Sequence, residues 1–193
     1  MNPLPQSWFA KSALTLAPRL LGKVVKKGSC VGIIVETEAY GTDPASHAYR
    51  VTKRSAPMRD SWGHWYVYFT YGMHWCANVT SDKGGIGAVL IRAVEPKGGL
   101  GTMKHRRKTD NIRALCSGPA KFCQAFGITG AQNKSPVTDG FARHTGRSVS
   151  GFAIYDAPEI PKTRIATSPR VGITSGTELP WRFYIKGNPF VSR

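Results

Sequence analysis

Cysteine is scarce in this chain, and its four cysteines exclude two kinds of stabilisation. Cys30, Cys76, Cys116 and Cys123 include no CxxC pair and no neighbouring Cys or His at the spacing of a structural zinc site. Each stands among apolar neighbours, which favours small buried thiols in a reducing compartment over a disulfide framework. We therefore expect no metal site and no disulfide.

Long apolar runs are also missing. No stretch reaches the length of a membrane span, and no basic segment before Lys11 leads into an unbroken apolar run. We expect a soluble, intracellular protein without a membrane partner. A length of 193 residues, with 41% hydrophobic and 20% charged residues, predicts one globular domain over 1–193.

Acidic residues are the third scarcity. The chain has 11 Asp and Glu against 27 Lys and Arg, which gives a formal net charge of +16 and a pI near 10.1. Such a field attracts polyanions. Nucleic acid is therefore the leading partner class, ahead of an anionic membrane surface.

The pattern of apolar residues and turn residues predicts an antiparallel-rich α+β fold. Residues 12–21 read as a short helix that Pro18 should start or kink. The other expected elements are a hairpin of 21–27 with 30–40, a hairpin within 65–79 turning at 71–73, a strand over 86–94 ended by Glu95-Pro96, helices on both sides of Gly118-Pro119 within 111–126, and strands at 171–173 and 181–185.

Two of the few acidic residues stand two apart on an expected strand, so that Glu36, Glu38 and Tyr40 share one face. A carboxylate held near a substrate in a partly apolar site can deprotonate a water molecule. The alternative is that each Glu pairs with one of the many Arg or Lys side chains. Glu36 is the better candidate for that structural role.

Aromatic residues are dense around the second hairpin. Tyr66, Tyr68 and Tyr71 either fill the core of the sheet or, in so basic a protein, stack on a base while the apolar tip inserts into nucleic acid. His47 is either a hydrogen-bonded surface residue or part of a site. The run 104–108 (KHRRK) offers phosphate contacts, or is a solvated face.

Several motifs follow one another along the chain: LLGK at 20–23, VETEAY at 35–40, HAYR at 47–50, YVYFTYGMH at 66–74, LCSGP at 115–119, LPWRFY at 179–184 and GNPFVS at 187–192. Taken together, they resemble the alkyladenine (3-methyladenine) DNA glycosylase family. The resemblance implies a curved sheet with flanking helices and a protruding β-hairpin that inserts into DNA. It also implies a monofunctional base-excision-repair enzyme without a cofactor.

Such an enzyme flips a damaged purine out of double-stranded DNA and hydrolyses its N-glycosidic bond with an activated water. The substrates implied are 3-methyladenine, 7-methylguanine, hypoxanthine and ethenoadenine. We expect a monomer that acts in the bacterial cytoplasm at the nucleoid, or in the nucleus if the source is eukaryotic.

The resemblance also assigns the chemistry. Glu38 becomes the base that activates water, with Arg92 and the backbone carbonyl of Val171 helping to hold it. Tyr71 fills the gap left in the duplex, entering from the minor groove. Asn78 forms the pocket wall that turns away the guanine amino group.

The same resemblance predicts a stacked pocket for the flipped base. Tyr40 stacks on one face of the base, His47 and Tyr68 lie on the other, and the backbone of His47 reads the base edge. An electron-rich ring attracts the electron-poor ring of a cationic alkylated purine.

The sequence departs from the family pattern in the segment after His47. Val51, Ser55 and Arg59 stand where the family often has Gly, Asn and Phe, and Ser61-Trp62 replaces a proline-rich pair. Because we expect this segment to border the pocket, it bears on substrate breadth. Pro18 is a second departure, of structural consequence.

Two other classes of function compete with a glycosylase. A non-catalytic basic nucleic-acid-binding protein would explain the charge and the aromatics, but it has no reason to place the carboxylate of Glu38 against phosphates that it would repel. A metal-dependent nuclease needs several converging carboxylate or His ligands, and few acids are available.

Overall fold

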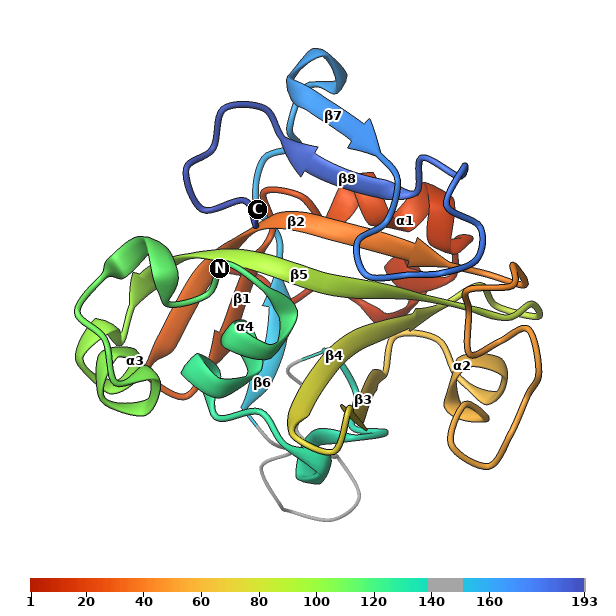
Figure 1. Ribbon diagram of the computed structural model, residues 1–193, viewed down its shortest axis with the longest axis horizontal. Helices are drawn as coiled ribbons and strands as arrows, with labels where there is room; N and C mark the ends of the chain where they lie inside the picture. Colours follow the sequence, from red (N-terminus) through yellow and green to blue (C-terminus); the bar gives the residue numbers. More distant parts are fainter. Residues whose placement is uncertain (139–150, 193) are drawn as a thin grey trace.

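A computed structural model of the chain describes residues 1–138 and 151–192 (Figure 1). In this part of the chain eight strands form one antiparallel sheet that curls around its core, as expected for an α+β fold. The strands are β1 Val24–Lys27, β2 Cys30–Tyr40, β3 Trp65–Thr70, β4 His74–Ser81, β5 Gly87–Gly98, β6 Phe152–Tyr155, β7 Ile165–Ser168 and β8 Arg182–Ile185. The helices are α1 Ala13–Leu20, α2 Pro57–Asp60, α3 Leu100–Arg107 and α4 Pro119–Phe126, with 3-10 turns η1 Gln6–Phe9, η2 Ile112–Ala114, η3 Gly130–Gln132 and η4 Lys162–Arg164.

The long strand β2 lies at the centre of the sheet. The strand order is β3-β4-β5-β2-β1-β6, and β7 pairs with β8. One edge of β2 pairs with β5 along most of its length, and the other edge pairs first with β1 and then, at residues 36–38, with β8. Both glutamates of β2 are therefore flanked by neighbouring strands, in the interior of the molecule.

Helix α1 packs its apolar face on β2. The hydroxyl of Ser12 caps the helix by accepting from the amide of Thr15, at 3.3 Å. The buried residues Ala13, Leu16, Ala17 and Leu20 recur at helical spacing and join the main hydrophobic core. Pro18 lies inside the helix, so of the two predicted alternatives the start of the helix is wrong, and a kink stays a prediction. The helix ends at Leu20, so only a short piece of it follows the residue that cannot donate a backbone bond.

The hairpin of β3 and β4 is confirmed, with its turn where the sequence places it. Trp65 pairs with Val79 and Thr70 with His74. Tyr71 and Gly72 at the turn both have positive φ, of 50° and 65°. Such a turn matches the twist of the two strands that it joins.

Strand β5 continues past the expected stop at Glu95-Pro96. Beyond Leu90 its outer edge is no longer paired with β4, and Pro96 lies opposite Gly32, next to a bulge at which Lys97 of β5 is the extra residue. An edge position next to a bulge tolerates a residue without an amide hydrogen. The prediction that the proline ends the strand is therefore wrong.

Other expectations were wrong in the connecting regions. Residues 171–173 form no strand, and the segment before Gly118 contains only the 3-10 turn η2, whereas α4 begins at Pro119 as predicted. Helix α3 was not predicted because Met103 is its only buried residue, so no apolar period marks it.

Two further findings bear on the sequence expectations. All four cysteines are free and buried, as predicted. None of the helices formed by the described residues has the length and apolarity needed to cross a bilayer.

Candidate active site

A cavity of about 290 Å³ lies between β2, the β3–β4 hairpin and the loop around residue 171. Its wall contains seven of the eight residues that the sequence analysis singled out: Tyr40, His47, Tyr68, Tyr71, Asn78, Arg92 and Val171. The eighth, Glu38, lies directly behind the wall. The structure therefore brings the predicted site residues together from β2, β3, β4, β5 and two loops.

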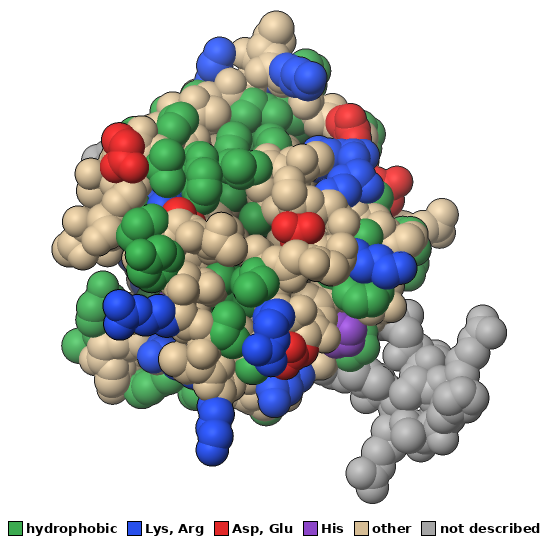
Figure 2. All heavy atoms as spheres, turned by 90° about the vertical axis from the view of Figure 1, so that its right-hand side faces the viewer, with side chains coloured by type: hydrophobic (Ala, Val, Ile, Leu, Met, Phe, Trp, Pro, Cys, Tyr) green, Lys and Arg blue, Asp and Glu red, His purple; other side chains and the backbone are tan. Residues whose placement is uncertain are grey.

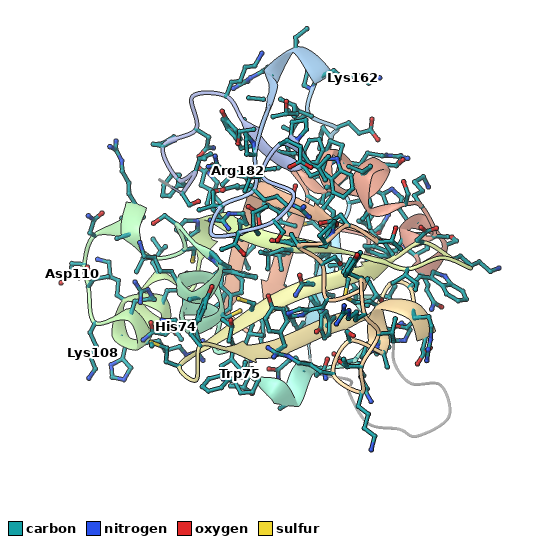
Figure 3. The ribbon with its side chains drawn as sticks, turned by 45° about the vertical axis from the view of Figure 1, so that its right-hand side comes forward. His74, Trp75, Lys108, Asp110, Lys162 and Arg182 are labelled. Carbon is teal, nitrogen blue, oxygen red and sulfur yellow. The ribbon has the colours of Figure 1, made fainter. Side chains whose placement is uncertain are left out.

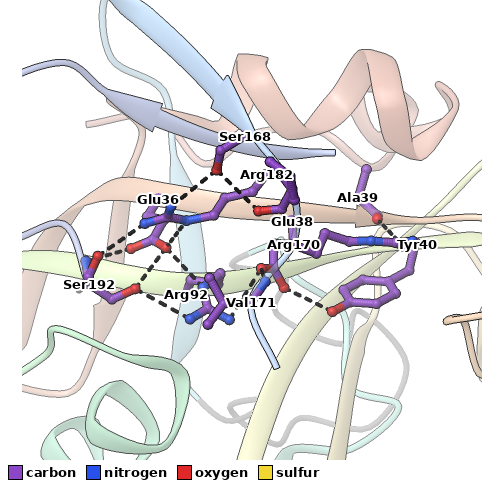
Figure 4. A network of polar contacts seen from close by, with 11 residues as sticks. Glu36, Glu38, Ala39, Tyr40, Arg92, Ser168, Arg170, Val171, Arg182 and Ser192 are labelled. Carbon is purple, nitrogen blue, oxygen red and sulfur yellow. Dashed lines mark hydrogen bonds and ion pairs between the residues drawn. The ribbon is translucent and has the colours of Figure 1, made fainter. Parts of the chain in front are cut away.

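The carboxylate of Glu38 is fully buried and is held by three residues that line the cavity. The amide of Val171 donates to Oε1 at 2.7 Å, the hydroxyl of Tyr40 donates to Oε2 at 2.8 Å, and Nη1 of Arg92 lies 3.3 Å from Oε1 (Figure 4). A buried charge with this many fixed donors keeps one geometry.

The contact of Val171 differs in kind from the expectation. The sequence analysis gave its backbone carbonyl a role beside the water, whereas the contact in the structure is made by its backbone amide, with Glu38 itself. The loop of residues 169–173 therefore orients the carboxylate. Val171 also lines the cavity, so the role of its carbonyl stays a prediction.

Glu36 has a different environment, two residues earlier on the strand. Its carboxylate accepts from Nε of Arg92 at 2.9 Å, Nε of Arg182 at 2.7 Å, and the amide and hydroxyl of Ser192 at 2.7 and 2.8 Å. Burial alone would raise the pKa of Glu36, but the bonds from Ser192 and Arg182 and the charge of Arg92 hold it below its ordinary value. Glu36 is therefore ionised, and its hydrogen bonds connect β2 with β5, with β8 and with Ser192 near the end of the chain.

Arg92 connects the two carboxylates. Its Nε binds Glu36, its Nη1 faces Glu38, and its Nη2 donates to the hydroxyl of Ser192 at 3.3 Å. Burial lowers the pKa of Arg92, but the two carboxylates outweigh this effect and raise it above the usual value. The guanidinium therefore stays charged at the cavity wall.

Two of the predicted stacking residues, His47 and Tyr68, are in contact with each other. His47 packs on Tyr68 with ring centres 4.7 Å apart, and its Nδ1 lies 2.9 Å from the hydroxyl of Tyr66. Burial and the charge of Arg54 both lower the pKa of His47, which keeps its ring neutral near pH 7. Burial and the charge of Glu38 raise the pKa of Tyr40, so its hydroxyl stays protonated and donates.

Asn78 lies on β4, opposite Tyr66 of β3 and Leu90 of β5. Its side chain is 4% exposed, and Nδ2 donates to the carbonyl of Tyr66 at 3.1 Å. The amide group is thus fixed against the sheet while it lines the cavity.

The tip of the β3–β4 hairpin is apolar and exposed. Tyr71 is 80% exposed, Met73 65% and Phe69 44%. Figure 3 shows His74 and Trp75 at the start of β4, just after this turn. Exposed apolar side chains gathered at one tip indicate a contact surface.

The segment that departs from the family pattern contributes little to the cavity. Its lining includes Met58 but none of Val51, Ser55 and Arg59. Ser55 is buried in a local turn, where its hydroxyl accepts from the amide of Thr52, and Arg59 is exposed.

Two arginines of the basic run at 104–108 make structural contacts. Arg106 and Arg107 donate to the carbonyls of Ala125 and Leu115, so they hold α3 against its neighbours. Lys108 and Asp110 lie at the outer edge of the molecule, far from Arg182 at its centre (Figure 3). Figure 2 shows basic side chains in several separate groups over one face of the molecule rather than in a single band.

Sequence reasoning missed the residues that support the wall from behind, chiefly Asp43, Arg170, Arg182 and Ser192. Arg170 and Asp43 are a buried ion pair, with 2.6 Å between Nη2 and Oδ1. No local pattern marks such residues, because their partners lie far away in the sequence. In residues 1–138 and 151–192, no three His, Cys, Asp or Glu side chains are grouped so that they could hold a metal ion.

Comparison with known proteins gives one consistent result. Residues 7–189 match the family model for Methylpurine-DNA glycosylase (MPG). The chain is 43% identical over 194 residues to a protein of Agrobacterium fabrum (98% of this chain, 92% of the relative) and 44% identical over 197 residues to one of Rhodopseudomonas palustris (100% and 90%). It is 46% identical over 195 residues to one of Burkholderia lata (98% and 90%). All three carry the name "Putative 3-methyladenine DNA glycosylase".

Proposed function

Since the chain belongs to the methylpurine-DNA glycosylase family, we propose that it excises alkylated and deaminated purines from DNA by a water that Glu38 activates. Membership of the family makes the protein a DNA glycosylase, a hydrolase of N-glycosyl bonds that serves DNA repair. The substrates we propose are 3-methyladenine, 7-methylguanine, hypoxanthine and ethenoadenine, flipped out of duplex DNA.

The observation that carries this proposal is a buried carboxylate behind a cavity of suitable size. All three partners of Glu38 line the cavity, so a water molecule bound at that wall lies beside a fixed proton acceptor. Glu38 removes a proton from this water as its oxygen bonds to the C1′ atom of the deoxyribose. The electron pair of the N-glycosidic bond leaves with the purine. An alkylated cationic purine leaves as a neutral molecule, and a neutral purine such as hypoxanthine leaves as an anion that takes up a proton from solvent.

The aromatic walls bind the flipped base. Tyr40 stacks on one face, and His47 with Tyr68 stacks on the other, with the backbone of His47 at the base edge. Asn78 disfavours bases that carry the exocyclic amino group of guanine, and the positive charge of 7-methylguanine, which weakens its N-glycosidic bond, offsets this effect for that base. Tyr71, exposed at the hairpin tip, inserts from the minor groove into the space that the base leaves, as the ring of a wedge residue does.

A non-catalytic DNA-binding protein accounts less well for this geometry. Its basic surface would need no carboxylate at the wall of a base-sized cavity, and Glu38 is held there by an arginine, a backbone amide and a tyrosine. All proposed groups come from one chain, so we propose that a monomer acts.

The test is release of free base from duplexes that each carry one defined lesion. We expect the wild type to release the damaged purine and to leave the DNA strand unbroken until alkali is added, because water rather than a lysine attacks. Glu38→Gln should bind the same duplex and release almost no base. A covalent protein–DNA adduct trapped by borohydride would contradict the proposed mechanism.

A further inference from the structure

A buried ion pair behind the cavity is not used by the proposed chemistry. The side chain of Arg170 is fully buried, that of Asp43 is 4% exposed, and Nη2 of Arg170 lies 2.6 Å from Oδ1 of Asp43. Neither residue lines the cavity. Burying two charges is costly unless further contacts compensate, so the surroundings of this pair should show what it does.

The guanidinium of Arg170 lies between two aromatic rings. Its Cζ atom is 4.7 Å from the ring centre of Tyr40 and 5.0 Å from that of Trp181. Because Tyr40 lines the cavity and Arg170 does not, the guanidinium supports the ring from its outer side. A guanidinium held this close to both ring centres restricts the movement of the Tyr40 ring.

The same pair joins three segments of the cavity wall. Nη1 of Arg170 donates to the carbonyl of Ala39 at 3.0 Å, at the end of β2 (Figure 4). The carboxylate of Asp43 accepts from the amides of Gly41 and Ala45 at 3.2 and 3.0 Å, which orders the loop that leads to the pocket residue at position 47.

The third segment is the loop that carries Arg170 itself. The next residue, Val171, donates its amide to Oε1 of Glu38 at 2.7 Å. An anchored Arg170 therefore fixes where that amide lies, and with it one of the three contacts of the carboxylate. A shift of about 1 Å at such a contact can cost an enzyme about 10²-fold in rate.

We propose that Arg170 is a positioning residue: it holds the ring of Tyr40 and the amide of Val171 where the flipped base and Glu38 require them. This inference rests on the proposed function, since Glu38 and Tyr40 are the groups that it positions. Asp43 serves by holding Arg170 and by ordering the loop after β2.

If Arg170 had only a structural role, the excision rate would fall only as far as the stability of the fold falls. The variant Arg170→Lys distinguishes this role from positioning. A lysine ammonium can pair with Asp43 and keeps the buried charges balanced, but it cannot lie flat between two rings while it also reaches the carbonyl of Ala39. We expect Arg170→Lys to fold with a melting temperature near that of the wild type. We expect its single-turnover excision rate to fall about 10- to 100-fold, with unchanged affinity for undamaged duplex.

Lys23→Gln is the matched control. Lys23 is 3% exposed in its side chain, pairs with Asp156 at 2.7 Å, and lies outside the cavity. Its loss should lower the melting temperature while the excision rate of the folded protein stays at the wild-type value. Excision by Arg170→Lys at the wild-type rate would overturn the proposal. So would a rate loss in Arg170→Lys that Lys23→Gln reproduces at equal loss of stability.

A second measurement does not depend on activity. In protein with ¹³C-labelled tyrosine, the ring of Tyr40 should give separate signals for its two edges in the wild type and averaged signals in Arg170→Lys. Identical ring signals in both proteins would overturn the positioning role. If the wild type releases no base from any lesion, the proposed function fails, while the ring signals still decide whether Arg170 holds Tyr40.

Discussion

Glu36 and Glu38 stand two residues apart on β2, and both side chains are fully buried. Within the described residues, Glu36 accepts four hydrogen bonds, from Arg92, from Arg182 and twice from Ser192. Glu38 accepts from Val171 and Tyr40 and faces Arg92 at a longer distance. The first region ties strands to the end of the chain, whereas the second forms the back wall of a cavity.

Because both residues are glutamates on one strand, their neighbours, and not the residue type, distinguish the structural carboxylate from the one that we propose as the base. Apart from Arg92, which contacts both carboxylates, the partners of Glu36 lie outside the cavity: Arg182 is on β8 and Ser192 is near the end of the chain. Every partner of Glu38 also lines the cavity, so that a substrate can reach the groups around it. Substitutions that change only one of the two regions test this separation.

The largest effect is expected for Glu38→Gln. The amide keeps the shape of the side chain but cannot take a proton from water, so the excision rate should fall about 10²- to 10⁴-fold. Affinity for the lesion-bearing duplex should stay near the wild-type value. Single-turnover base release and a binding titration measure the two quantities. Near-normal release would assign the role of base to Glu36 and would contradict the distinction between the two carboxylates.

Glu36→Gln should instead act on stability. It leaves Arg182 and Arg92 without their shared counter-charge, and breaking a buried pair from one side costs about 3–5 kcal/mol. Urea unfolding measures this loss. The protein that remains folded at low temperature should excise at a rate far above that of Glu38→Gln, and an inactive but fully stable Glu36→Gln would reverse the two assignments.

Lowering the pH should erase the difference between Glu36→Gln and the wild type. The pKa of Glu36 is lower in the folded protein than in the unfolded chain. Its contribution to stability is therefore complete above the unfolded pKa of about 4.3 and disappears as the pH falls through the folded value. Melting temperatures of both proteins between pH 7 and pH 3 test this convergence. Because His47 titrates in both, its effect cancels in the difference.

Asn78→Ala tests the region around Glu38, on the side of the cavity. Removing the amide opens space where guanine carries its exocyclic amino group, so the preference for adenine-type over guanine-type bases should fall about 10- to 200-fold. Excision of hypoxanthine is compared with that of 7-methylguanine and normal guanine. Asn133→Ala is the matched control, because Asn133 also bonds the backbone of β3, at Val67, but lies outside the cavity. Equal slowing of both classes would make Asn78 a structural residue of the sheet.

The smallest effect is expected for Tyr71→Ala. Since this side chain is 80% exposed, its loss should leave the free energy of unfolding unchanged. Excision of a well-paired lesion should slow by about 3- to 10-fold, because the ring offsets part of the unstacking cost, while mismatched lesions are affected less. Tyr71→Phe should restore the rate. A fluorescent base that flips equally in all three proteins would contradict insertion by Tyr71.

Local patterns predicted the parts of the fold whose causes are local. The strand β2, the turn at Tyr71 and Gly72 and the start of α4 at Pro119 all depend on neighbouring residues, and the structure contains each of them. The continuation of β5 through Pro96 depends instead on its pairing with β2, a strand far away in the sequence, across a bulge at Lys97. No residue next to Pro96 indicates that pairing.

The sequence by itself determined a basic, antiparallel-rich α+β protein with Glu38 as the candidate base, because charge, periodicity and ordered motifs can be read along one chain. The sequence also favoured Glu36 for a structural role. Only the tertiary structure decided which residues hold Glu36 and that Arg170 lies against Tyr40. Val171 is 133 residues from Glu38, and Ser192 is 156 residues from Glu36. Contacts over such separations are made when the sheet closes on its core, and no local pattern encodes them.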